Sequence, residues 1–130
     1  KLFADLGNED RAARVLSRAR EEGTTLPGSQ QEEISKRLSF LHKKRGDLDA
    51  AMLLWEESAE AGYIYAHVEL AKAYEHTHKN YAEALHWTLA ALELVNVETF
   101  PRYQQDAWLP KLRHRRERLK RRLKKQQNDT

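Results

Sequence analysis

Residues 64–95 read IYAHVELAKAYEHTHKNYAEALHWTLAALELV, and this stretch decides the fold. In its first half, Leu70 and Tyr74 are four residues apart, and in its second half Ala84 and Ala91 are seven residues apart. Apolar side chains at such spacings share one face of a helix. The sustained alternation that is typical of β-strands occurs nowhere in the chain. The sequence therefore predicts an all-α protein in which helices pack in pairs.

The same pattern occurs twice upstream. Ala12, Ala51 and Ala84 hold equivalent positions, separated by 39 and 33 residues. A period of about 34 residues with two helices per unit is characteristic of tetratricopeptide repeats. One such unit cannot bury its apolar face alone, so neighbouring units must stack. We therefore predict a tetratricopeptide-like superhelix of about two and a half to three helical hairpins, closed by a basic C-terminal helix.

Glycines and capping residues set the expected helix boundaries. Gly7, Gly23, Gly46 and Gly62 each follow a helical stretch and are expected to end it. Ser29, in a capping box with Glu32, and Asp47 are expected to begin helices. The expected helices cover residues 2–6, 9–22, 29–45, 47–59, 64–78, 81–95 and 109–125, with Pro110 in the first turn of the last one. The expected divisions are repeats in 1–108, a basic capping helix in 109–126 and a disordered tail in 127–130.

Composition excludes several classes of function. The chain has 130 residues and no Cys, which excludes disulfides, thiolate metal sites and cysteine nucleophiles. No apolar run reaches the roughly 20 residues that span a bilayer. There is no Gly-rich phosphate loop, Gly-x-Ser-x-Gly turn or His-Glu-x-x-His motif, so we expect no catalytic residue, metal site or cofactor. The chain opens with Lys1-Leu2-Phe3, without a signal-peptide pattern, and we expect a piece of a longer intracellular protein.

The C-terminal end is strongly basic. Residues 111–130 carry ten Lys and Arg against two acidic residues, whereas residues 1–110 carry 13 basic and 18 acidic residues. Leu112 and Leu119 lie on an apolar stripe, so the helix is expected to cap the last repeat and leave its cations in solvent. Such a patch suits phosphates, through Coulomb attraction and counterion release. The candidate nucleic-acid-binding residues are Lys111, Arg113, Arg115, Arg118, Lys120, Arg121, Arg122, Lys124 and Lys125.

Two other interpretations of this helix stay open. It could be a solvated or intramolecular cap whose cations offset the acidic body and the helix's own dipole, or it could bind an acidic protein. Few aromatic side chains follow Trp108, so we expect contact with the DNA or RNA backbone without base stacking or sequence readout.

A second candidate site is the inner groove of the predicted stack. By tetratricopeptide geometry, the first helix of each pair lines this groove, which could hold a peptide. Its candidate residues are Lys36, Phe40, Lys43, Lys44, Tyr65, Lys72 and Glu75. The alternative is a solvated concave surface, or one that the closing helix covers.

Tryptophans have structural explanations in this scheme. Trp55 is the large packing residue of its repeat and is expected in the core. Trp108 is expected to anchor the last helix together with Phe100 and Tyr103.

Five stretches have sequences that are more specific than the generic repeat requires: KRGDL at 44–48, LWEE at 54–57, ELAKAYEH at 69–76, ALHWTLAAL at 84–92 and LRHRRERL at 112–119. Together they resemble the C-terminal region of a bacterial family. The N-terminal part of that family is a ribonuclease-H-like, metal-dependent 3′–5′ exonuclease domain of the type that uses four acidic residues. The resemblance implies that those acidic residues lie upstream of Lys1, and none is assigned to this chain.

The resemblance further implies a cytoplasmic accessory module of a DNA-processing enzyme. Its expected partners are nucleic-acid backbone, the upstream nuclease domain or a helicase-type protein, with no membrane. The alternative is a stand-alone tetratricopeptide scaffold for protein–protein interaction. Because the first helix is incomplete, a dimer through this N-terminal end is also expected.

Overall fold

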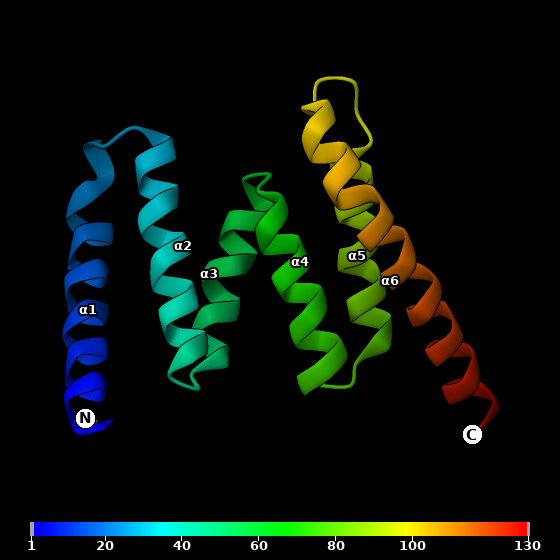
Figure 1. The fold of residues 1–130 in the computed structure, drawn as a ribbon, viewed down its shortest axis with the longest axis horizontal. Coiled ribbons are helices and arrows are strands. Elements are labelled where there is room, and N and C mark those ends of the chain that lie inside the picture. The colour runs from blue at the N-terminus through cyan, green and yellow to red at the C-terminus, as the bar shows by residue number, and fades with distance from the viewer. Residues whose placement is uncertain (1, 130) are drawn as a thin grey trace. The chain divides into compact units, whose positions relative to one another are not determined.

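The computed structural model describes the backbone of residues 2–129, and within this range the side chains of all residues except 2–6 and 24. Every regular element in 2–129 is helical, as the sequence predicts, and the range contains no strand (Figure 1). The chain divides into two compact units, residues 1–58 and 59–130. The expected dimer surface at the N-terminal end involves side chains outside the described residues.

The N-terminal unit is built from α1 (Leu2–Glu22), a 3-10 turn (Gly23–Thr25), α2 (Gly28–Lys44) and most of α3 (Leu48–Glu60). Helices α1 and α2 pack as an antiparallel hairpin (Figure 1). Ala13, Leu38 and Leu54 contribute one buried side chain from each helix to a shared apolar cluster. Burial of these spaced apolar side chains is what stabilises helices of this length.

Trp55 adds a buried polar contact to this unit. As expected from its place in the repeat, its side chain is fully buried. Its indole Nε1 donates to the hydroxyl of Ser39 (2.9 Å), and that hydroxyl donates to the carbonyl of Lys36 (2.7 Å). The ring of Phe40 meets the indole edge-on at 6.1 Å between centroids. The buried indole nitrogen is therefore satisfied by a neutral partner.

The C-terminal unit is built from α4 (Ile64–Lys72), a π-helical turn (Ala73–Thr77), α5 (Tyr81–Val95) and α6 (Arg102–Asn128). Helix α5 packs against both α4 and α6. The core joins the three helices through Val68 of α4, Ala91 and Val95 of α5, and Leu112 of α6.

Several predicted boundaries are confirmed. Helix α5 has the bounds predicted for it, 81–95. Gly46 and Gly62 end their helices with φ of 84° and 91°, a conformation that Gly adopts without steric cost. Asp47 begins α3, since its carboxylate accepts from the amide of Ala50 (3.2 Å).

Other predicted boundaries are wrong. Gly7 lies inside α1, so the two helices expected over 2–22 are one. Gly23 begins a 3-10 turn and has no positive φ. The capping box at Ser29 does not form: α2 begins at Gly28 after Pro27, without a side-chain cap. At these positions the packing of α1 on α2, and not the local capping residue, determines where the helices begin and end.

Helix α6 begins seven residues earlier than the predicted Leu109. Pro110 therefore lies inside the helix, where its missing N–H leaves the carbonyl of Asp106 without its usual partner. Both residues are exposed, so water can replace that bond. Gln105 explains the early start, because its side-chain amide donates to the carbonyls of Val95 (2.8 Å) and Val97 (2.9 Å) and so ties α6 to the end of α5.

The expected disordered tail is also partly helical. Gln127 and Asn128 belong to α6, and Thr130 lies outside the described residues. The division expected after residue 108 falls within the same helix. The boundary between the two compact units follows Ser58 in the sequence.

Candidate nucleic-acid interface on the C-terminal helix

The inward side of α6 faces a buried carboxylate. Glu75 lies in the π-helical turn and is fully buried. In this turn the amide of His78 bonds to the carbonyl of Ala73, five residues earlier (3.2 Å). A π turn accommodates one extra residue in a helix, and such turns are frequent at functional positions. Lys79 then ends the helix with φ of 54°, in the place where Gly46 and Gly62 end theirs.

Glu75 holds three arginines of α6. Arg118 makes a two-point contact, with Nε 2.7 Å from Oε2 and Nη2 2.9 Å from Oε1. Arg115 donates from Nη1 to Oε1 at 2.5 Å, and Nη1 of Arg122 lies 3.5 Å from Oε2. His76 adds its Nε2 at 3.8 Å from Oε1. We call Glu75 with these three arginines the Glu75 cluster. Charge-assisted and bidentate hydrogen bonds of this kind are stronger than hydrogen bonds between neutral groups.

The cluster shifts the pKa values of its members. Burial on its own would raise the pKa of Glu75, but the hydrogen bond from Arg118 and the charges of Arg118 and Arg115 outweigh it and lower the pKa below its ordinary value. Partial burial and the nearby arginines lower the pKa of His76, against the opposing charge of Glu75. Burial lowers the pKa of Arg115, whereas the hydrogen bond to Glu75 raises that of Arg118. Glu75 is therefore ionised at neutral pH.

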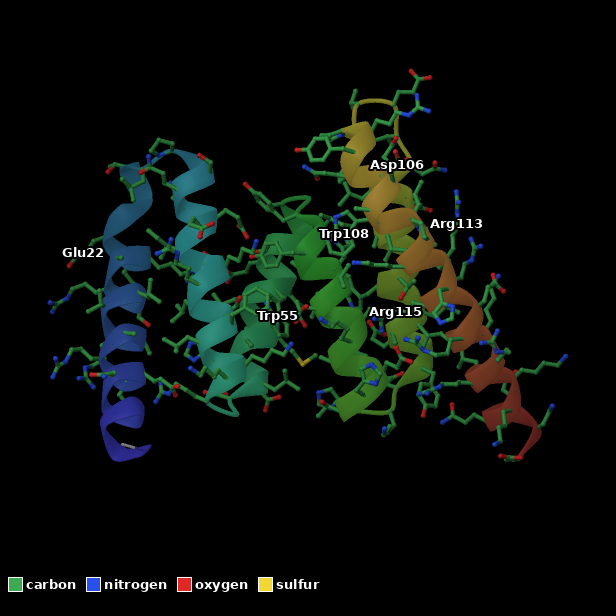
Figure 2. All side chains as sticks on the ribbon, viewed as in Figure 1. Glu22, Trp55, Asp106, Trp108, Arg113 and Arg115 are labelled. Atoms are coloured by element: carbon green, nitrogen blue, oxygen red, sulfur yellow. The ribbon has the colours of Figure 1, made fainter. Side chains whose placement is uncertain are left out.

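This geometry corrects one part of the predicted interface. Arg115, Arg118 and Arg122 were expected to face solvent, and they are only partly exposed because they turn toward Glu75. Arg122 also lies over the ring of Tyr81, at 5.5 Å from the centroid. Figure 2 shows Arg115 on the side of α6 that faces α4, and Arg113 on the opposite side. These three arginines connect α6 to the π-helical turn of its own unit.

The outward side of α6 carries the other predicted cations. Successive helical residues are about 100° apart, so five of these cations fall within an arc of about 140°. We call this set the outward basic face: Arg113, Lys120, Arg121, Lys124 and Lys125. All five are exposed, and none of them forms an ion pair with a described side chain. Glu117 lies on the same side, and its carboxylate accepts from Arg116 (3.0 Å).

Lys111 stands apart from this face. Its Nζ lies over the ring of Trp108, 5.9 Å from the centroid, which is a cation–π distance. Trp108 packs with Phe100 against the core of the unit, as predicted. Tyr103, predicted to join them, is instead 74% exposed.

The residues of the predicted peptide groove lie in different surroundings. Glu75 is buried in its cluster and unable to line a groove. Lys44 pairs with Glu9 (3.1 Å), and Lys72 pairs with Glu69 (2.7 Å). Lys43 lies over the rings of Phe40 and Trp55.

Lys36 and Phe40 belong to the N-terminal unit, and Tyr65 belongs to the C-terminal unit. Lys36 is exposed, and Phe40 and Tyr65 are half-buried.

The described residues contain no group of three His, Asp or Glu side chains that could hold a metal ion. His67, which is buried, hydrogen-bonds through Nδ1 to the carbonyl of Tyr63 (3.0 Å). No helix in the described part is long and apolar enough to cross a membrane.

Comparisons with protein-family models, with curated proteins and with solved structures gave no match to this chain.

Proposed function

We propose that this chain is a non-catalytic, tetratricopeptide-like helical-repeat module that holds nucleic-acid backbone on the outward basic face of α6. The observation that carries the proposal is the set of five exposed cations on one side of this helix, without ion pairs among the described residues. Unpaired cations keep their full attraction for phosphates and release counterions when they bind them.

The length of the face fits a nucleic-acid strand. Arg113 and Lys125 are 12 residues apart, which is about 18 Å along a helix axis. Phosphates of one DNA strand repeat at about 3.4 Å along the duplex axis, so several of them fall within that length. The Glu75 cluster serves this surface indirectly, because it fixes α6 on α4 and α5 and presents the outward side to solvent. Since the outward face has no aromatic side chain to stack on bases, it contacts the backbone irrespective of sequence.

The biological setting of the proposal rests on the sequence resemblance alone. A module of this kind would act beside an upstream exonuclease domain of a bacterial DNA-processing enzyme in the cytoplasm, holding the nucleic acid while the other domain cuts it. In the same setting, a helicase-type protein is a second proposed partner.

One observation favours a second candidate function. Three of the nine predicted nucleic-acid-binding residues are used inside the Glu75 cluster, as a purely structural cap would require. In that case the chain is a scaffold for protein–protein interaction, and the outward cations only keep the cap solvated. This candidate predicts no binding to DNA at low salt.

Fluorescence anisotropy with labelled duplex and single-stranded DNA separates the two candidates. The test variant is Lys120→Glu with Lys124→Glu, which reverses two outward cations and leaves the Glu75 cluster untouched. The matched control is Arg11→Glu with Arg14→Glu, the same charge change at two exposed positions of α1. We expect the test variant to bind DNA at least about tenfold more weakly than the control. Equal affinities for both variants, or no binding by the unmodified chain, would contradict the proposal.

A further inference from the structure

A shallow groove runs between α5 and α6 within the C-terminal unit. It has a volume of 310 Å³, and its floor is formed by Leu89 and Leu92 of α5 and Leu109 of α6. Arg113 and Arg116 of α6 and Glu93 of α5 lie at its rim. The groove thus combines an apolar floor with a rim that carries more positive than negative charge.

Helix α5 is apolar on two sides, and the second side is covered only in part. Ala84, Ala91 and Val95 are buried on its inward side. A second stripe follows from Leu85 through Leu89 to Leu92, at spacings of four and three residues. Leu89 in this stripe is 41% exposed. Leu85 and Leu92 are half-buried, and Leu92 packs against the core, so Leu89 is the part of this stripe that remains open to a partner.

We infer that this groove binds an amphipathic helix of a partner protein, with leucine-type side chains on one side and acidic side chains flanking them. The apolar floor would receive side chains at i, i+3, i+4 and i+7 of such a helix. A helix suits the groove because its ridges of side chains fit between those of two packed helices.

Charge complementarity argues for the acidic flanks. Arg113 at the rim forms no ion pair within the described residues, and neither does Lys120, which lies seven residues further along the same side of α6. Among the described residues that line the groove, Glu93 is the only acidic one, and Arg116 already pairs with Glu117. An acidic flank would meet these cations, whereas a basic flank would be repelled by them. This interaction goes beyond the proposed nucleic-acid contact and does not depend on it.

The test uses the whole chain and three fluorescein-labelled helical peptides of equal length. The first peptide carries leucines at i, i+3, i+4 and i+7 with glutamates at the flanking positions. The second keeps the glutamates and replaces each leucine by alanine, and the third keeps the leucines and replaces each glutamate by lysine. We expect the first peptide to bind at least about tenfold more tightly than either of the others.

Two single substitutions locate the binding surface. Leu89→Gln should weaken binding of the first peptide by about five- to tenfold, since it places a polar group on the groove floor. Leu53→Gln is the matched control at an exposed leucine of α3, 64% accessible, and should leave the affinity unchanged within about twofold. Both changes are electrically neutral, so DNA binding by Leu89→Gln should match that of the unmodified chain. The two proposals therefore succeed or fail separately.

Four results would overturn the inference. They are no binding of the first peptide, equal binding of the first and second peptides, equal binding of the first and third, and an affinity that Leu89→Gln does not change. Sedimentation velocity adds a fifth outcome. If the unmodified chain dimerises and Leu89→Gln abolishes the dimer, the occupant of the groove is a second copy of this chain and not an acidic partner.

Discussion

The two sides of α6 carry the same kind of side chain in opposite surroundings. Arg115 on the inward side is half-buried and donates to Glu75, whereas Arg113, two residues earlier, is exposed and forms no ion pair within the described residues. Identical guanidinium groups therefore lie in different surroundings, which the location of the nearest carboxylate decides. A charge reversal on the inward side tests stability, and one on the outward side tests binding.

The largest expected effect comes from the inward side. Glu75→Gln keeps the shape of the side chain and removes the charge that three arginines share. Since a partly buried cation without its counter-ion is strongly destabilising, we expect a loss of about 3 kcal/mol or more in the free energy of unfolding, measured with urea by circular dichroism. The control is Glu117→Gln on the exposed side of α6, which should change the free energy by less than about 0.5 kcal/mol. Similar values for the two variants would mean that the cluster does not hold α6.

A neutral buried contact in the N-terminal unit is expected to give a smaller effect. Ser39→Ala removes the hydroxyl that accepts from the indole of Trp55 and leaves a buried N–H without a partner. Such losses typically cost about 1–3 kcal/mol, and the same urea titration measures the change. An unchanged free energy would show that the indole finds another acceptor.

Acid should weaken the cluster gradually. The lowered pKa of Glu75 means that its contribution is present above about pH 4.3, the unfolded-state value, and is lost as the pH falls through the folded-state value. The lowered pKa of His76 makes stability decrease already below about pH 6.5. We therefore expect the free energy of unfolding to fall as the pH drops below about 6.5, and to fall further below about pH 4.3.

Substitutions assign the two parts of this pH profile. His76→Gln should reduce the pH dependence of the free energy of unfolding just below about pH 6.5, and Glu75→Gln should reduce it below about pH 4.3. A profile that both variants leave unchanged would exclude the cluster as the cause.

The smallest expected effect tests a helix start. Ser29 makes no capping hydrogen bond at the beginning of α2, so Ser29→Ala should change the free energy of unfolding by less than about 0.5 kcal/mol. A loss of about 1 kcal/mol, typical of a true N-cap, would restore the capping box that the sequence suggests.

Helical periodicity predicted those parts of the fold that apolar spacing determines. The bounds of α5, the burial of Trp55 and the caps at Gly46 and Asp47 all follow from local patterns. The start of α6 does not, because it depends on Gln105 reaching the carbonyls at the end of α5. Local signals could not reveal a contact made across the turn between two helices.

The Glu75 cluster was missed for a related reason. A glutamate on a helix is ordinarily read as solvent-exposed, and its arginine partners lie 40 to 47 residues away in the sequence. One signal was available: the third repeat has an extra residue before Tyr81, and the π turn at Ala73–Thr77 accommodates it. The outward cations, by contrast, were predictable, since a run of ten basic residues on one helix exceeds what a single inward side can hold.

The central claim is tested most directly by the salt dependence of DNA binding. For the unmodified chain, anisotropy titrations with duplex DNA at several salt concentrations should give a slope of log K against log salt of about −4.5, the value for five neutralised phosphates. Lys120→Glu with Lys124→Glu should make that slope shallower by about 2. A slope near zero, or one that the substitutions leave unchanged, would contradict the account and leave α6 as a structural cap.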